Sequence, residues 1–113
     1  MSNPGEDDLQ LFYDKRSGRF FEASLFKVQQ AEYYINRELT MRDYVYLNEW
    51  YEELGLDIVE DGYALGWSVG MCLACYWQNW IDFNHQHKTT DDGRDYISIS
   101  FWQEPMINFE EYC

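Results

Sequence analysis

Apolar side chains recur at helical spacing in the first half of the chain. The first set follows at intervals of three or four residues and consists of Leu25, Val28, Ala31, Ile35 and Leu39. This spacing places the five side chains on one face of a helix. Ser24 precedes them and belongs to the residue types that cap helix N-termini. We therefore predict an amphipathic helix over about residues 25–38.

A second helical stripe follows almost immediately. Its apolar members are Tyr44, Leu47, Tyr51 and Leu54, spaced by three, four and three residues. Thr40 is the expected N-cap, and Asp43 stands where an acidic side chain favours the first turn. Gly55 follows the stripe and suits the left-handed residue that ends many helices. These features predict a second amphipathic helix that ends at Leu54.

Two β-hairpins are predicted at the ends of the chain. The first joins 9–13 to 19–22 through 14–18, a segment that begins with Asp and ends near Gly. The second joins 80–88 to 96–103 through a turn containing Asp92-Gly93, a strong hairpin signal. Its expected inward residues are Ile81, Phe83, His85 and His87 on one strand, and Ile97, Ile99 and Phe101 on the other. Pro105 is expected to end the second strand.

The segment between the helices and the second hairpin is less patterned. Residues 56–70 contain Gly62, Gly66 and Gly70 and predict a loop with one short turn. Residues 71–78 are apolar without alternation, which leaves a short buried helix and a strand both open. The sum predicts an α+β fold, in which antiparallel β-hairpins form a small sheet packed against two amphipathic helices.

Length and composition fit a single domain. The chain has 113 residues, of which 46% are hydrophobic and 19% aromatic. We expect a flexible acidic segment over residues 1–8 and one domain over residues 9–113. No apolar run reaches the roughly 18–20 residues of a membrane-spanning helix, and no secretory signal opens the chain. The expected location is the cytoplasm, and three cysteines fit a reducing compartment.

The net charge restricts the partners. The chain carries 21 Asp and Glu against 8 Lys and Arg, for a net charge of −13. Residues 1–42 hold seven acids and six bases, whereas residues 43–113 hold fourteen acids and two bases, a net of −12. Such a surface repels nucleic acid and anionic membranes. It favours a basic, nucleic-acid-binding protein as partner, with homo-oligomer formation left open. The alternative is that the charge keeps an aromatic-rich protein in solution.

Six acidic residues are the predicted partner-binding site. They are Glu49, Glu52 and Glu53 on the second helix and Asp57, Glu60 and Asp61 just beyond it. Neighbouring helical side chains lie about 5–6 Å apart, close to the roughly 3.4 Å between phosphates along a DNA strand. An acidic row can therefore imitate a row of phosphates, unless it is only a solvated helix face. Aromatic residues can add binding anchors or can belong to the core: Trp50, Tyr63, Trp67, Trp77, Trp80 and Trp102.

A zinc site and a catalytic site are both disfavoured. Cys72, Cys75, His85 and His87 contain suitable zinc ligands, but their spacing departs from the usual roughly 12–15 residues between pairs. Asp82 lies on the opposite strand face from both histidines, so an acid–base pair is not expected. No phosphate loop, nucleophile elbow or calcium loop appears in the sequence. We expect no catalytic residue, no metal and no cofactor.

Several blocks along the chain carry a resemblance to known sequences. The blocks are Phe20–Ser24, Ala31–Arg37, Leu47–Tyr51, Leu54–Leu56, Gly66–Ser68, Trp80–Phe83 and Asp91–Gly93. Together they resemble small uncharacterised proteins encoded by phages and prophages of gut Gram-positive bacteria, from about Leu11 to Phe109. The resemblance implies a phage context but transfers no functional residue, because the family has no assigned activity.

Charge, size and resemblance together favour a non-enzymatic, acidic phage protein that blocks a basic nucleic-acid-binding host protein. This hypothesis describes a DNA-mimic-type inhibitor of a defence nuclease such as a CRISPR effector. The alternative is a phage structural or assembly component that acts by protein–protein association through its aromatic surface. A small zinc-dependent adaptor is a third hypothesis.

Overall fold

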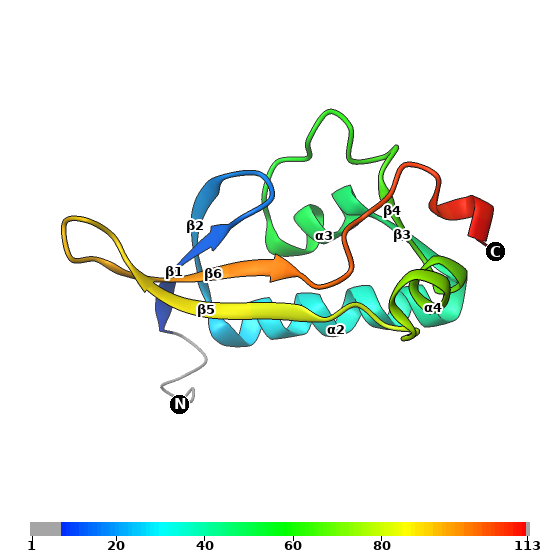
Figure 1. Cartoon of the computed structure of the whole chain (residues 1–113). Coiled ribbons are helices and arrows are strands. Elements are labelled where there is room, and N and C mark those ends of the chain that lie inside the picture. The colour runs from blue at the N-terminus through cyan, green and yellow to red at the C-terminus, as the bar shows by residue number, and fades with distance from the viewer. Residues whose placement is uncertain (1–7, 113) are drawn as a thin grey trace.

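Over residues 8–112 the fold combines a four-stranded sheet, a two-stranded sheet and three α-helices (Figure 1). The structure is a computed structural model that describes residues 8–112. Most of the predicted flexible segment 1–8 therefore lies outside the described residues. The α+β class predicted from the sequence is confirmed. No helix in the described part of the chain is long and apolar enough to cross a membrane.

Both predicted hairpins are present in the larger sheet. Its strands are β1 (Leu9–Asp14), β2 (Arg19–Ser24), β5 (Phe83–Thr89) and β6 (Asp95–Phe101), in the order β2-β1-β6-β5. The β1–β2 and β5–β6 pairs are antiparallel, and their turns use Gly18 and Gly93 with φ of 70° and 90°. These positive φ values explain why glycine occurs in both turns.

The two antiparallel hairpins are joined by a parallel pairing, which the sequence did not predict. Strands β1 and β6 pair in parallel, with Phe12, Tyr13 and Asp14 beside Ile97, Ser98 and Ile99. The chain leaves the sheet after β2, passes through the helices and returns with β5, so that β6 runs in the direction of β1. The sheet is consequently mixed, and β6 is one of its two central strands.

The first helix is longer than predicted. Helix α2 spans Leu25–Arg42, and the hydroxyl oxygen of Ser24 accepts a hydrogen bond from the Lys27 backbone N–H, as expected for an N-cap. The predicted stripe is buried from Val28 to Leu39, and Leu25 is half-buried. Thr40 lies inside α2, so its predicted role as the cap of a second helix is wrong. The helix ends instead at Asp43, which adopts the left-handed conformation with φ of 72°.

The predicted second helix is a strand followed by a shorter helix. Strand β3 (Tyr44–Tyr46) pairs with β4 (Gly66–Ser68), and α3 then spans Leu47–Leu54. Tyr44 therefore belongs to a strand and is exposed, whereas the other stripe members are buried. Gly55 ends α3 with φ of 79°, as predicted. Strand β4 lies within the predicted loop. A side chain at Gly66 would approach the Val45 carbonyl oxygen to 2.3 Å, so the pairing requires glycine there.

The ambiguous apolar segment is helical. Helix α4 spans Val69–Tyr76, and Ser68 caps it by accepting a hydrogen bond from the Met71 N–H. Only Met71 and Cys72 of this helix are buried. The chain closes with a short 3₁₀ helix, η1 (Phe109–Tyr112), whose Phe109 is buried. Figure 1 shows α4 and η1 at the end of the molecule opposite the β5–β6 turn.

Helices α2 and α3 pack on one face of the larger sheet. Trp50 of α3 contacts the rings of Phe83 and Phe101 at centroid distances of 4.6 and 6.2 Å. Residues of this inward face, including Ile97 and Ile99, form the core with α2. The alternate residues of the strands face away from the helices. Among them Tyr13, Phe20 and Tyr96 form an aromatic cluster with centroids 4.7–6.0 Å apart.

Candidate protein-binding surface

The six predicted partner-binding residues separate into two groups. Glu49, Glu52 and Glu53 lie on α3. The others, Asp57, Glu60 and Asp61, lie on the connection between α3 and β4 and are exposed. The two groups differ in which charged and polar side chains surround them.

Glu49 is a structural residue of α3. Its carboxylate accepts hydrogen bonds from both terminal nitrogens of Arg42, at 2.6 and 3.0 Å, and from the Tyr46 backbone N–H at 2.7 Å. The last bond satisfies a backbone donor at the helix N-terminus. Hydrogen bonding to Glu49 raises the pKa of Arg42, whose guanidinium also lies 4.8 Å from the centre of the Tyr44 ring. The charge of Glu49 is therefore largely compensated inside the protein.

Glu52 and Glu53 lie with carboxylates of α2 around two tyrosines. Glu52 accepts a hydrogen bond from the Tyr63 hydroxyl, and this bond is the main cause of the raised pKa of Tyr63. Hydrogen bonding to Glu38 and its charge raise the pKa of Tyr34, and the charges of Glu53 and Glu49 add to the effect. Carboxylates of both α2 and α3 thus act on Tyr34, whereas those that act on Tyr63 belong to α3. We call the set Tyr34, Glu38, Glu49, Glu52, Glu53 and Tyr63 the acidic face.

Two members of the acidic face, Tyr34 and Glu38, were not predicted from the sequence. Glu38 lies four residues after Tyr34, so both side chains project from the same side of α2. That spacing was a usable signal in the sequence. The proximity of Glu38 to α3 depends on the packing of the two helices, which the local pattern does not reveal.

The loop group lies beside arginines. Arg19 donates a hydrogen bond to the Asp57 carbonyl oxygen at 2.8 Å, and Asp61 lines a hollow of about 340 Å³ together with Arg16. Buried Asn48 holds the loop through two hydrogen bonds to the backbone of Val59, at 2.8 and 3.0 Å. The loop group is therefore ordered. Arginines lie near Asp57 and Asp61, although none of the three loop carboxylates forms an ion pair among residues 8–112.

A buried glycine supports the same loop. The backbone N–H of Asn48 donates to the Gly62 carbonyl oxygen at 3.0 Å. A side-chain carbon at Gly62 would lie 2.0 Å from the Asn48 amide oxygen, which is closer than any real contact. Gly62 thus permits the close approach that fixes the position of Asp57, Glu60 and Asp61.

The predicted aromatic anchors divide between core and surface. Trp50 and Trp67 are fully buried, whereas Tyr63, Trp77, Trp80 and Trp102 are exposed. Tyr63 belongs to the acidic face. The three tryptophans belong to the segment between α4 and β5 and to the end of β6.

The four potential zinc ligands do not form a metal site. Cys72 is buried, which raises the pKa of its thiol to about 11, whereas Cys75 is exposed. His85 pairs with Glu32 of α2 at 2.5 Å, and His87 is exposed. In the part of the chain that the structure describes, no group of three or more His, Cys, Asp or Glu side chains is arranged to hold a metal ion.

Asp82 is engaged away from the histidines, in agreement with its predicted position. Its carboxylate accepts hydrogen bonds from the Gln78 amide and the Trp80 indole, both at 2.9 Å. The described hydrogen bonds therefore do not pair Asp82 with His85 or His87.

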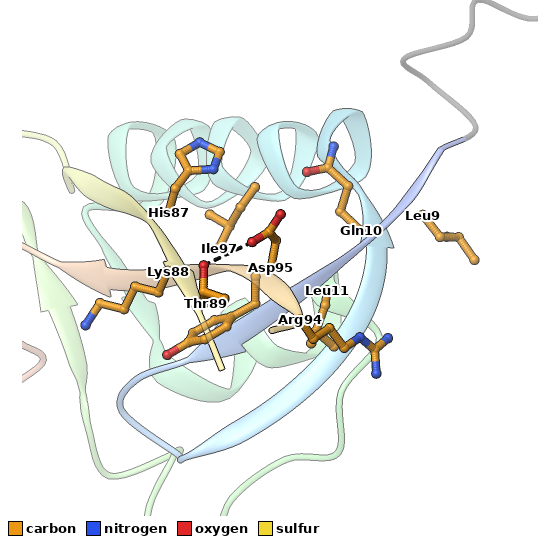
Figure 2. Close-up of a pocket in the computed structure, with 10 residues that line it drawn as sticks. Leu9, Gln10, Leu11, His87, Lys88, Thr89, Arg94, Asp95 and Ile97 are labelled. Atoms are coloured by element: carbon orange, nitrogen blue, oxygen red, sulfur yellow. Dashed lines mark hydrogen bonds between the residues drawn. The ribbon is translucent and has the colours of Figure 1, made fainter. Parts of the chain in front are cut away.

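A hollow lies where two strands diverge. It has a volume of about 510 Å³ and separates the start of β1 from the β5–β6 hairpin, because the parallel β1–β6 pairing covers only Phe12–Asp14 of β1. Figure 2 shows Lys88 and Arg94 pointing away from each other at its rim, and Asp95 bonded to Thr89. The residues that line this hollow include no Ser, Cys or Lys paired with a base, the arrangement expected of an activated nucleophile.

Comparison with known proteins assigns a family without an activity. A family of unknown function, DUF6353, matches residues 3–110, so the chain belongs to this family. No curated protein and no solved structure matches the chain.

Proposed function

We propose that this DUF6353 protein is a non-enzymatic binding protein that presents its acidic face to a basic, nucleic-acid-binding protein of a bacterial host. The concrete candidate for the partner is a defence nuclease such as a CRISPR effector. Binding would occupy the groove that otherwise holds nucleic acid, so the protein acts by competition.

The free carboxylates of the acidic face carry this proposal. Glu38, Glu52 and Glu53 take part in none of the ion pairs found among residues 8–112. They surround Tyr34 and Tyr63, so a partner would meet carboxylates and aromatic rings on the same surface. Arginine side chains in a nucleic-acid-binding groove are suited to both, because guanidinium pairs with carboxylates and stacks on rings.

The overall charge supports the same partner. The net charge of −13 attracts a basic surface over long range and accelerates encounter at low salt. The same charge opposes association with nucleic acid. A protein with these properties competes with nucleic acid for a third molecule without binding nucleic acid itself.

The experiment separates the acidic face from the loop group. The face variant combines Glu38→Gln, Glu52→Gln and Glu53→Gln, and it leaves Glu49 in place. The loop variant combines Asp57→Asn, Glu60→Gln and Asp61→Asn, and it changes the net charge by the same amount. Each chain is immobilised and exposed to the DNA-binding fraction of a bacterial lysate, which is then eluted with increasing salt.

The wild-type chain should retain a basic protein that elutes with salt, and the loop variant should retain it with nearly the same strength. The face variant should bind about tenfold more weakly or worse, which corresponds to roughly 1.4 kcal/mol or more. Equal retention by all three chains would exclude the acidic face as the binding surface.

A second candidate is a phage structural or assembly component that acts through aromatic surface. The exposure of Trp77, Trp80 and Trp102 favours it. This function predicts a stable oligomer or a complex with another phage protein that survives high salt, and sedimentation measurements at low and high salt distinguish it from the first.

A further inference from the structure

Three tryptophans lie exposed around one end of the larger sheet. The exposed fractions are 88% for Trp77, 48% for Trp80 and 59% for Trp102, whereas Trp50 and Trp67 are fully buried. Tryptophan is highly buried on average, because its ring removes a large apolar area from water. We call Trp77, Trp80 and Trp102 the tryptophan surface. Tryptophans are also enriched among residues that dominate binding energy at interfaces.

Asp82 organises this surface. Its carboxylate accepts hydrogen bonds from the Trp80 indole and the Gln78 amide, both at 2.9 Å. Its carbonyl oxygen accepts one from the Trp102 backbone N–H at 2.9 Å. The Asp82 N–H in turn donates to the side chain of buried Gln103 at 2.7 Å. The segment that carries two of the exposed indoles is therefore held before any partner arrives, which lowers the entropy lost on binding.

Trp77 occupies a position that suits glycine better for folding. It ends α4 in the left-handed conformation, with φ of 64°, where a side chain is strained and glycine is usual. Its ring is almost wholly exposed, so it gains little from burial in the core. An aromatic residue here adds strain and exposed apolar area without a folding benefit, which points to binding.

Charge identifies the kind of partner. The surface is built around the carboxylate of Asp82. Glu104, two residues after Trp102, pairs with Arg16 at 3.5 Å, so its charge is already partly compensated. No Lys or Arg occurs between residues 43 and 87. A second copy of the chain would bring another net charge of −13 to this surface, which opposes self-association. A cationic segment meets no such repulsion.

We propose that the tryptophan surface binds arginine side chains of a cationic protein segment, with guanidinium groups stacked on the indoles near Asp82. The inference rests on the proposed function, since these arginines belong to the same basic partner. That partner would contact the acidic face and, at a second place, the tryptophan surface. The protein contains an internal example of the geometry. Arg42 pairs with Glu49 and lies 4.8 Å from the centre of the Tyr44 ring. Guanidinium stacks on aromatic faces more readily than a lysine ammonium, so arginine is the expected contact.

The test follows the indole N–H signals of the full chain by two-dimensional NMR. An octa-arginine peptide is the probe, an octa-lysine peptide is the control for charge, and Trp→Phe variants assign the five indole signals. The signals of the tryptophan surface should shift with octa-arginine, and those of Trp50 and Trp67 should remain in place. Octa-lysine should produce smaller shifts.

Two variants separate binding from folding. Trp77→Gly should keep or raise the melting temperature, because glycine relieves the left-handed strain, and should weaken octa-arginine binding about two- to fivefold. Tyr33→Ala removes an aromatic ring of α2 that is 71% exposed, and it should leave binding unchanged. Equal affinity of Trp77→Gly and wild type for octa-arginine would overturn the proposal. Indole shifts that depend on protein concentration without peptide would overturn it in favour of a second copy.

The outcome is distinguishable from that of the proposed function. The face variant should retain the indole shifts with octa-arginine even where its total affinity falls. If the indole signals stay in place while the wild-type chain still captures a basic protein, the tryptophan surface is excluded and the acidic face stands. If the signals shift but no nucleic-acid-binding protein is captured, the tryptophan surface stands and the acidic face is excluded.

Discussion

Replacement of Glu49 by alanine tests whether the carboxylates of α3 have been assigned to the right roles. In the structure the Glu49 carboxylate satisfies the Tyr46 backbone N–H and pairs with Arg42 through two hydrogen bonds. Loss of a helix-capping interaction costs about 1 kcal/mol. The ion pair is partly exposed, with side-chain exposures of 33% and 20%, and contributes roughly 0.5–1 kcal/mol.

The two losses sum to about 2 kcal/mol of unfolding free energy. For a domain of this size, 1 kcal/mol shifts the melting temperature by roughly 4–8 °C, so Glu49→Ala should melt about 10 °C below the wild type. Glu49→Gln should lie between the two, because an amide oxygen still accepts the Tyr46 hydrogen bond but carries no charge for Arg42. Thermal unfolding followed by circular dichroism at low salt measures all three.

The matched control is the pair Glu52→Gln and Glu53→Gln. Neither residue forms an ion pair within residues 8–112, and substitutions at such surface positions stay within about 0.5 kcal/mol. A Glu49→Ala protein that melts within about 2 °C of the wild type would refute the structural role. If Glu52→Gln and Glu53→Gln lowered the free energy of unfolding as much as Glu49→Ala does, stability and binding could not be separated on α3.

Two further predictions concern pH and the acidic loop. Hydrogen bonding to Glu32 raises the pKa of His85 above its ordinary 6.5, so the pair stabilises the fold fully below about pH 6.5 and this contribution is lost as the pH rises through the raised value. The melting temperature should fall with pH over that range in wild type and in His87→Gln, and it should change less with pH in Glu32→Gln. An equal pH dependence of the melting temperature in wild type and Glu32→Gln would contradict this. Asn48→Ala should cost about 2–3 kcal/mol in urea unfolding and speed amide hydrogen exchange at Val59, because it removes both hydrogen bonds to that backbone; unchanged exchange would show that the loop is held in another way.

Local sequence patterns predicted the elements whose formation depends on residues close together in the sequence. The α2 stripe and its Ser24 cap are visible because they repeat within one turn. The turns at Gly18 and Gly93 are visible because they require positive φ. The helical prediction for Tyr44 is wrong, because its spacing fits a helix but the pairing of β3 with β4 places it in a strand. The parallel contact of β1 with β6 joins residues about 85 positions apart and has no local signal.

In the candidate site, too, some features have a local sequence signal and others depend on tertiary contacts. The acidic residues of α3 were identifiable from their type and position, but the role of Glu49 depends on Arg42, seven residues away across a strand. The sequence also left open which tryptophans are core residues. Trp50 and Trp77 have the same side chain, and only the packing of α3 and α4 makes one buried and the other exposed. Tertiary contacts therefore decided which predicted residues remain available to a partner.

Competition for a nucleic-acid-binding protein is the measurement that tests the central claim most directly. The protein captured by the immobilised chain is bound to fluorescent duplex DNA, and the wild type, the face variant or the loop variant is added at constant salt. The wild type and the loop variant should displace the DNA, and the face variant should require about tenfold more protein. A complex in which the captured protein holds the wild-type chain and DNA together would contradict competition through the acidic face.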